Sequence, residues 1–134
     1  MTEVAKVMAA AALFDDPPEH AATVRFLADP GHHLLVAYVD GRPAGMVSGV
    51  ETTHPDKGTE MFLYELGVED PYRRRGVATA LVEALRRLAQ ARGCHSMWVG
   101  VDADNEAALA TYRRARGGEP EPCVTFTWEL AGES

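Results

Sequence analysis

The chain has 134 residues, of which 46% are hydrophobic, so it holds enough apolar material for one compact core and too little for two. Its formal net charge of -7 argues against a nucleic-acid-binding protein, which would present a basic surface. Its apolar runs are too short to cross a membrane, and the N-terminal stretch lacks the basic start of a secretory signal. We therefore expect a single cytoplasmic domain over residues 1–134.

The charges are unevenly distributed along the chain. Residues 73–116 hold nine basic and four acidic side chains, whereas the rest of the chain holds four basic and sixteen acidic ones. This asymmetry favours binding of an anion at one end of the protein and of a cation at the other. The two cysteines, Cys94 and Cys123, lie far apart beside apolar runs, and we expect reduced, buried thiols rather than a disulfide.

The first half of the chain predicts two helices and then three strands. An alanine-rich stretch favours the first helix, and Asp29-Pro30-Gly31 ends the second. Alternating apolar residues on both sides of Asp40-Gly41 predict a β-hairpin with a tight turn. A polar loop over 53–58 precedes the third strand. In chain order the expected elements are helices over 2–14 and 19–28 and strands over 33–39, 44–52 and 60–68.

The second half predicts alternating helices and strands. Apolar residues recur at helical spacing up to Gly93, which ends the helix, and a strand over 94–101 follows. This strand should run parallel to the preceding one because a helix connects them. The next helix opens at Asp102 to Asn105 with Asp104 as its cap, and a closing strand spans 124–130. The two apolar helix faces consist of Val77, Leu81, Leu85 and Leu88, and of Ala108, Leu109, Tyr112 and Ala115.

A turn rich in arginine joins a strand to the start of a helix. A basic run alone is more often a solvated surface, but here the free N–H groups and the dipole of the helix start favour an anion. Gly76 and Ala78 are small enough for a phosphate to approach the backbone. Neither the Gly-Lys-Ser/Thr motif nor the dinucleotide glycine spacing is present. The predicted phosphate turn consists of Arg73, Arg74, Arg75, Gly76, Val77, Ala78 and Thr79.

Two motifs resemble the GNAT family of N-acetyltransferases, which use acetyl-coenzyme A. Arg73-x-x-Gly76-x-Ala78 after the strand YELGV is similar to the family's pyrophosphate-binding signature, and Asn105-x-x-Ala108-x-x-x-Tyr112 has the spacing of two residues on its next helix. The run EMFLYELGVEDPYRRRGVATALVEALRRLAQARG resembles the aminoglycoside 3-N-acetyltransferases. The resemblance covers roughly residues 34–130. It implies an α/β fold with flanking helices and a mixed, mostly antiparallel sheet whose central parallel strands splay apart.

The chain departs from this family pattern in two places. It starts at or inside the first helix, so the sheet's first edge strand has no counterpart, and Tyr112 is followed by RRARGG where most relatives reach glycine sooner and then phenylalanine. An uncovered sheet margin would leave room for a second subunit, so we expect a possible homodimer.

The resemblance also implies roles for individual residues. Acetyl-coenzyme A would be held by the phosphate turn, by the backbone of Leu66, Gly67 and Val68, and by Asn105, Ala108 and Tyr112. Glu65 is the candidate general base, the alternative being an anchor for substrate charge only. Tyr112 is the candidate acid for the leaving thiolate, the alternative being a core tyrosine. Asn105 would bind the pantetheine arm, the alternative being a helix cap.

The expected acceptor is a polycationic amine, in the first place an aminoglycoside. The expected substrate-binding carboxylates are Glu51, Glu60, Glu65 and Glu129. His54 and Asp56 lack a third ligand, so no metal site is expected. A polyamine or a protein amine is the alternative acceptor, and a non-catalytic module that binds coenzyme A is the alternative class.

Overall fold

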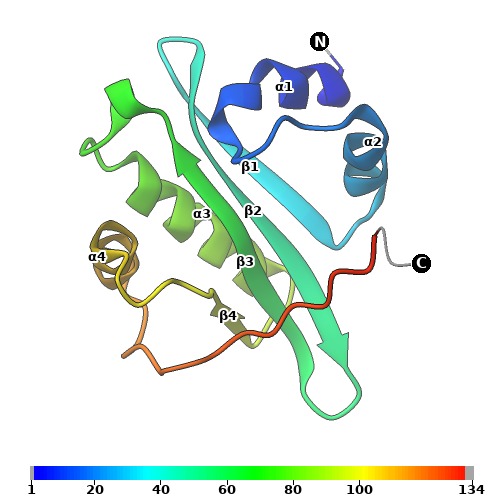
Figure 1. Ribbon diagram of the computed structural model, residues 1–134, viewed down its shortest axis with the longest axis vertical. Helices are drawn as coiled ribbons and strands as arrows, with labels where there is room; N and C mark the ends of the chain where they lie inside the picture. The colour runs from blue at the N-terminus through cyan, green and yellow to red at the C-terminus, as the bar shows by residue number, and fades with distance from the viewer. Residues whose placement is uncertain (1, 132–134) are drawn as a thin grey trace.

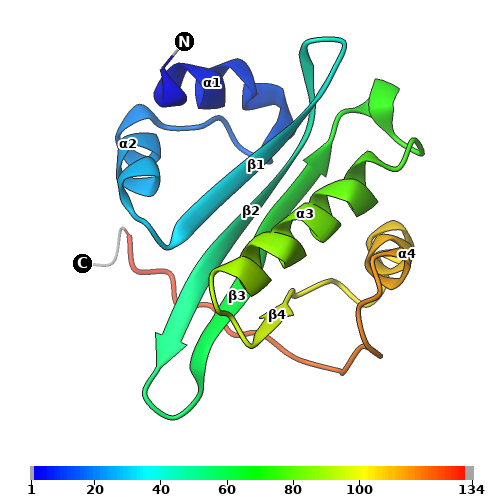
Figure 2. The ribbon, with the colours of Figure 1, turned by 180° about the vertical axis from the view of Figure 1, so that it is seen from behind.

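The computed structural model describes residues 2–131 as one four-stranded sheet with helices on both faces (Figures 1 and 2). The strand order is β1-β2-β3-β4, with β1, β2 and β3 antiparallel and β3 parallel to β4. The mixed sheet with flanking helices predicted from the sequence is confirmed. In chain order the elements are α1 (Glu3–Ala9), the 3-10 turn η1 (Ala11–Leu13), α2 (His20–Ala28), β1 (His32–Val39), β2 (Arg42–His54), β3 (Gly58–Val68), the 3-10 turn η2 (Asp70–Tyr72), α3 (Val77–Ala91), β4 (Ser96–Trp98) and α4 (Glu106–Arg114).

The β1–β2 hairpin has the tight turn expected of Asp40-Gly41. Both residues have positive φ, 50° and 78°, which is the geometry of a two-residue hairpin turn. The second hairpin is longer than expected, because residues 53, 54 and 58 of the expected loop extend the β2–β3 ladder and only residues 55–57 form the turn. Thr53 pairs with Thr59, and their hydroxyl oxygens lie 2.9 Å apart.

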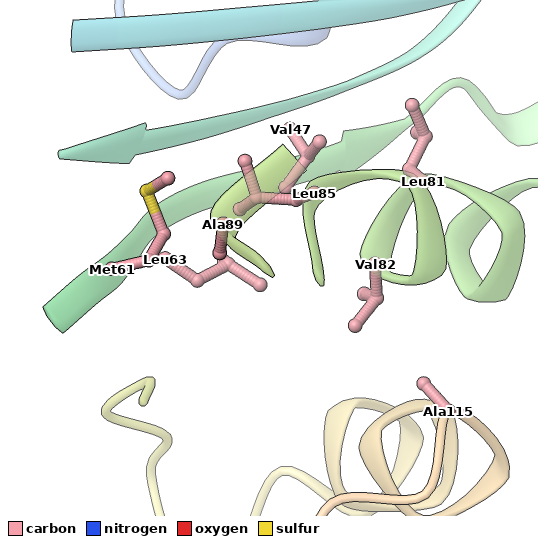
Figure 3. Close-up of a cluster of buried hydrophobic side chains, with 8 residues drawn as sticks. All are labelled: Val47, Met61, Leu63, Leu81, Val82, Leu85, Ala89 and Ala115. Atoms are coloured by element: carbon pink, nitrogen blue, oxygen red, sulfur yellow. The ribbon is translucent and has the colours of Figure 1, made fainter. Parts of the chain in front are cut away.

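α3 covers one face of the sheet and forms the main core (Figure 3). Leu81 and Leu85 pack against side chains of β2 and β3, of which Met61 and Leu63 are at most 2% exposed, whereas Val82 points toward Ala115 at the end of α4. The predicted helix and its end are confirmed: Gly93 has φ 84°, and Cys94 N–H closes on the Ala89 carbonyl at 2.9 Å.

α1, η1 and α2 lie on the opposite face, over β1 and β2. Alternate residues of β1 divide between the two layers, so that Leu34 packs toward η1 and Leu35 toward α3. The expected helix over 2–14 was too long, because the chain leaves α1 after Ala9 and places Leu13 on the sheet. A β-carbon on Gly67 would lie 2.2 Å from the Leu13 carbonyl oxygen, so this crossing requires glycine on β3.

Three expectations for the second half of the chain were wrong. β4 is shorter than the expected 94–101 because only three residues pair with β3, and the cap of α4 is Asn105 rather than Asp104. Residues 124–130 form no strand. This tail crosses the face opposite α3 in both views, and its large apolar side chains are 74–80% exposed (Figures 1 and 2). Alternation of apolar and polar residues favours an extended backbone, but a strand also needs a neighbouring strand to which its backbone can hydrogen-bond.

The cysteines are both free, as expected, although Cys94 is only half-buried and Cys123 is exposed on the tail. Burial raises the pKa of the Cys94 thiol. Among residues 2–131, no helix has the length and apolar character needed to span a bilayer.

Candidate active site

A β-bulge on β3 determines where Glu65 points. Ser48 of β2 pairs with Glu65 and the next residue, Gly49, pairs with Leu63, so Tyr64 is an extra residue in the ladder. Leu63 packs into the α3 core, and simple alternation would send Glu65 to the same side. The bulge shifts the alternation by one, so Leu66 packs toward α3 and Glu65 lies on the opposite face.

A backbone N–H from the N-terminal region holds the Glu65 carboxylate. Asp15 N–H donates to Glu65 Oε2 at 2.8 Å, which is possible because η1 crosses β3 directly over Gly67. The crossing thus brings the backbone of Asp15 to Glu65, and the side chains of Asp15 and Asp16 are exposed. The sequence alone does not indicate this contact, since 50 residues separate Asp15 from Glu65 and no local pattern connects them.

β3 and β4 are paired only at one end. The parallel ladder joins Glu60–Phe62 to Ser96–Trp98 and stops there, which confirms the expected parallel pair that splays apart. Glu69 N–H donates to the Ala44 carbonyl at 2.9 Å, so Leu66 and Val68 direct their backbone groups away from β2 and toward the gap.

Gly67 behaves differently from its two neighbours. It lies opposite Met46 in the β2–β3 ladder and directs its backbone groups to β2, so it does not fit the expected contact with a pantetheine arm. Its contribution is the space it leaves for the Leu13 carbonyl. Leu66 and Val68 keep the expected orientation, although Arg73 Nε already donates to the Val68 carbonyl at 3.2 Å.

The predicted phosphate turn is the N-terminus of α3. Gly76 is the N-cap with φ 80°, and Ala80 N–H donates to its carbonyl at 3.0 Å. The N–H groups of Val77, Ala78 and Thr79 therefore lie ahead of the first intrahelical bond and can bind an anion. A β-carbon on Gly76 would meet nothing within 4 Å, so the left-handed backbone, not a close contact, requires glycine here.

The three arginines before α3 have different surroundings. Arg73 is bound within the turn, since its NH1 lies 2.9 Å from Asp70 and its Nε contacts the Val68 carbonyl. The Arg75 guanidinium lies over the Tyr72 ring at 5.7 Å from its centroid. Arg74 has φ 63° and is exposed. Arg73 therefore fixes the shape of the turn, whereas Arg74 and Arg75 supply positive charge at its surface.

α4 presents Asn105 and Tyr112. Asn105 Oδ1 accepts from the Ala108 N–H at 3.1 Å, so the capping alternative is present, and the Ala108 N–H is not free for a cofactor. The side-chain NH2 of Asn105 remains available as a donor. Tyr112 is half-buried against the α3 core. Burial raises the pKa of its phenol above the ordinary value of 10.0, so it stays protonated at neutral pH.

Two of the other expected carboxylates, Glu51 and Glu60, contact residues that do not surround Glu65. Glu51 is on the α3 side, where its Oε2 lies 2.6 Å from His33 Nε2 and 2.8 Å from Arg92 Nε. The His33 hydrogen bond and the Arg92 charge lower the pKa of Glu51. This position does not fit an acceptor site. Glu60 accepts from the Ser96 hydroxyl at 3.3 Å near the start of β3, and Glu129 lies on the exposed tail.

Three features come directly after the carboxyl ends of the two parallel strands: the gap between β3 and β4, the N-terminus of α3 and the N-cap of α4. The acetyltransferase (GNAT) family matches residues 4–117, which include all three features. The chain belongs to this family.

Two curated relatives share sequence with the chain. An acetyltransferase of Pectobacterium atrosepticum is 36% identical over 93 residues, which cover 69% of this chain and 62% of that protein. A mycothiol acetyltransferase of Salinispora arenicola is 41% identical over 90 residues, which cover 65% of this chain and 27% of that protein. The chain thus spans less than two thirds of the length of either relative.

Solved structures share the fold over nearly the whole chain. An aminoglycoside acetyltransferase from an uncultured soil metagenomic sample, in complex with sisomicin, gives a TM-score of 0.87 at 18% identity, covering 96% of this chain and 90% of that one. Another aminoglycoside acetyltransferase from such a sample gives 0.83 at 29% identity, covering 96% and 93%. A 6'-N-acetyltransferase of Acinetobacter haemolyticus gives 0.74 at 23% identity, covering 97% and 96%. The neighbours whose names state a position are 6' enzymes, so they do not support the expected 3-N assignment.

Proposed function

We propose that this protein transfers an acetyl group from acetyl-coenzyme A to a primary amine of an aminoglycoside. The observation that carries the proposal is the placement of Glu65. Glu65 lies on β3, and the Asp15 N–H holds its carboxylate. On the same strand, the backbone groups of Leu66 and Val68 that point away from β2 border the gap between β3 and β4. An amine bound at Glu65 would therefore lie next to an acetyl donor bound along that gap.

The phosphate turn fits coenzyme A. Open space at Gly76 and the N–H groups of Val77, Ala78 and Thr79 suit a pyrophosphate, and Arg74 and Arg75 add charge. Leu66 and Val68 would hold the pantetheine arm as an added strand, with the Asn105 amide donating from the other side. When bound, acetyl-coenzyme A supplies an acetyl thioester that an amine can attack.

The residues of the chain then have two proton transfers to perform. Glu65 takes a proton from the ammonium, directly or through water, which frees the nitrogen lone pair. The free amine then attacks the thioester carbon, and as the carbon–sulfur bond breaks the Tyr112 hydroxyl donates a proton to the leaving sulfur. The nitrogen gives up its second proton to the Tyr112 phenolate through solvent, and Glu65 releases the first proton to water, so the products are a neutral amide and a thiol. The raised pKa of Tyr112 keeps the phenolic proton in place until it is needed.

The acceptor class rests on charge and on one relative. Asp15 and Asp16 are exposed, and the Asp15 backbone contacts Glu65, so with Glu65 this segment would add negative charge that attracts a polycation. The solved structure at 29% identity is that of an aminoglycoside acetyltransferase. For the position, the resemblance of the sequence favours N-3, whereas neighbours are named for 6', and the NMR spectrum of the product decides between them.

A thiol-release assay with acetyl-coenzyme A tests the proposal. The acceptor panel contains aminoglycosides, polyamines and basic peptides. Thiol release that depends on aminoglycosides supports the proposal. Thiol release with polyamines or peptides alone would show that the acceptor belongs to one of those classes instead. Binding of acetyl-coenzyme A without release for any acceptor would indicate a non-catalytic binding module.

A further inference from the structure

Three aromatic side chains gather on the sheet face that carries Glu65. Phe62 of β3 stacks on Trp98 of β4 with 4.3 Å between ring centroids, and Tyr64 meets Phe62 edge-on at 5.8 Å. Phe62 is half-buried, whereas Tyr64 is 68% exposed and Trp98 is 51% exposed. Phe62 therefore fixes the positions of two rings that remain open to solvent.

The fold places this aromatic cluster beside the proposed reaction centre. Phe62 and Trp98 form the last pair of the short β3–β4 ladder, and the gap between the two strands opens directly after them. Tyr64 is the extra residue of the β3 bulge and precedes Glu65 in the chain, and both lie on the face opposite α3. An amine bound at Glu65 would therefore have the two exposed rings beside it.

Packing of the sheet accounts for only part of the cluster. A stacked pair on neighbouring strands contributes to packing, which explains Phe62 and Trp98. It does not explain Tyr64, because the bulge leaves this large ring in solvent between a core residue, Leu63, and the proposed base. A group of exposed aromatic rings next to a charged side chain is typical of a ligand-binding surface.

The faces of these rings suit a saturated ring that carries ammonium groups. An aromatic face is electron-rich, so it attracts an ammonium group and the C–H groups next to it. A saturated ring presents several such C–H groups at once. It also loses less conformational freedom on binding than a flexible linear polyamine does. The cluster and Glu65 together thus provide an electron-rich apolar contact next to a negative charge.

We propose that Tyr64 and Trp98, held in place by Phe62, form a stacking platform for one amino-sugar ring of the acceptor. The platform orients that ring so that its amine lies at Glu65, and it selects cyclic amines over linear polyamines. This inference rests on the proposed acetyl transfer and adds residues that determine the acceptor. Its tests measure binding of the acceptor, so they are independent of thiol release.

The first test measures acceptor binding by calorimetry, with and without coenzyme A, using kanamycin as the cyclic probe and spermine as the linear one. Tyr64→Ala and Trp98→Ala should each weaken kanamycin binding about 10-fold and change spermine binding about twofold or less. Tyr64→Phe keeps the ring and should keep the affinity. The matched control is Tyr38→Ala, which removes an exposed tyrosine from β1 and should leave both probes bound as in the parent protein.

Several results of this test would overturn the platform: unchanged kanamycin binding by Tyr64→Ala, an equal loss of spermine binding, or no kanamycin binding by the parent protein. Tyr64→Ala decides the test even if Trp98→Ala fails to fold, because Tyr64 is exposed and lies outside the β3–β4 ladder. Kanamycin bound through the platform without thiol release would instead overturn the proposed acetyl transfer and leave the platform in place.

The second test uses Trp98 as a reporter. The chain has two tryptophans, so Trp128→Phe leaves Trp98 alone and changes only an exposed residue of the tail. A saturated ring over Trp98 excludes water, so the tryptophan emission should shift to the blue as kanamycin is added. Spermine should leave the emission nearly unchanged. Emission that stays constant at saturating kanamycin would show that the acceptor does not contact Trp98.

Discussion

The backbone N–H of Asp15 donates a 2.8 Å hydrogen bond to the Glu65 carboxylate, across 50 residues of chain. The bond exists because two features coincide: the bulge at Tyr64 turns Glu65 to the face opposite α3, and Gly67 lets η1 cross that face. The crossing thereby positions the proposed base and brings the backbone of the acidic Asp15-Asp16 segment to it.

Glu65→Gln tests the proposed base. The amide keeps the shape and can still accept from the Asp15 N–H, but it cannot take a proton, so kcat should fall about 10²- to 10⁴-fold. A residue that only binds the acceptor would chiefly raise KM. Steady-state kinetics separate the two, with Glu83→Gln as the control because Glu83 contacts only Arg86 among the described salt bridges.

Tyr112→Phe tests the proposed acid. The ring still fills its place beside the core, so affinity for acetyl-coenzyme A should be nearly unchanged while kcat falls roughly 10²-fold. Tyr38→Phe on the exposed side of β1 is the matched control. Because burial raises the pKa of Tyr112 above its ordinary value of 10.0, the parent enzyme should lose no activity to Tyr112 ionisation near neutral pH. Full turnover in Tyr112→Phe would assign Tyr112 to packing.

Gly76→Asp tests the phosphate turn. The substitution places a negative charge where phosphate should bind and forces a side chain into a left-handed backbone, so acetyl-coenzyme A binding should be lost. Gly93→Asp introduces similar strain at φ 84° beyond the other end of α3. Each should cost about 1–3 kcal/mol of stability. Calorimetry should show that only Gly76→Asp loses cofactor binding, and equal retention by both would mean that the anion site lies elsewhere.

Asp16→Asn tests the acidic acceptor surface. Removing one carboxylate from the exposed Asp15-Asp16 segment, whose backbone contacts Glu65, should raise the acceptor KM several-fold and leave acetyl-coenzyme A affinity unchanged. In the parent enzyme the acceptor KM should rise with salt, because the Debye length falls from about 10 Å at 0.1 M to about 3 Å at 1 M. Asp40→Asn is the control, since asparagine tolerates the positive φ of that hairpin turn. A flat salt dependence would favour a neutral amine.

Glu51→Gln tests the half-buried ion-pair cluster on the α3 side. The His33 hydrogen bond and Arg92 lower the pKa of Glu51 below its ordinary value of 4.5. A depressed carboxyl pKa stabilises the folded state above the unfolded value, and this contribution is lost as the pH falls through the folded value. Glu51→Gln should therefore cost about 1–2 kcal/mol near neutral pH and make unfolding less dependent on pH below 4.5. Denaturant unfolding at several pH values measures both, and catalysis should be unaffected.

Local signals in the sequence were sufficient for much of the fold. Asp40-Gly41 predicted its hairpin turn, and the helical spacing up to Gly93 predicted α3 and its end. Gly76 at a strand-to-helix junction predicted the free N–H groups of the phosphate turn. Each of these features depends on residues close together in the sequence. Steric limits on φ determine the turns, and the periodicity of apolar residues determines the helix.

Tertiary structure alone decided the surroundings of Glu65. Alternation along β3 would have turned Glu65 into the α3 core, and only the pairing with β2 reveals the extra residue at Tyr64. Glu51 was expected from the sequence to be one of the acceptor-binding carboxylates, but in the fold it pairs with His33 and Arg92. Hydrogen bonds between segments tens of residues apart depend on how the helices pack on the sheet. The residues next to Glu65 or Glu51 in the sequence do not indicate that packing. The sequence by itself determined which residues could perform the chemistry, and the crossing of η1 over β3 decided which carboxylate is held in place to do so.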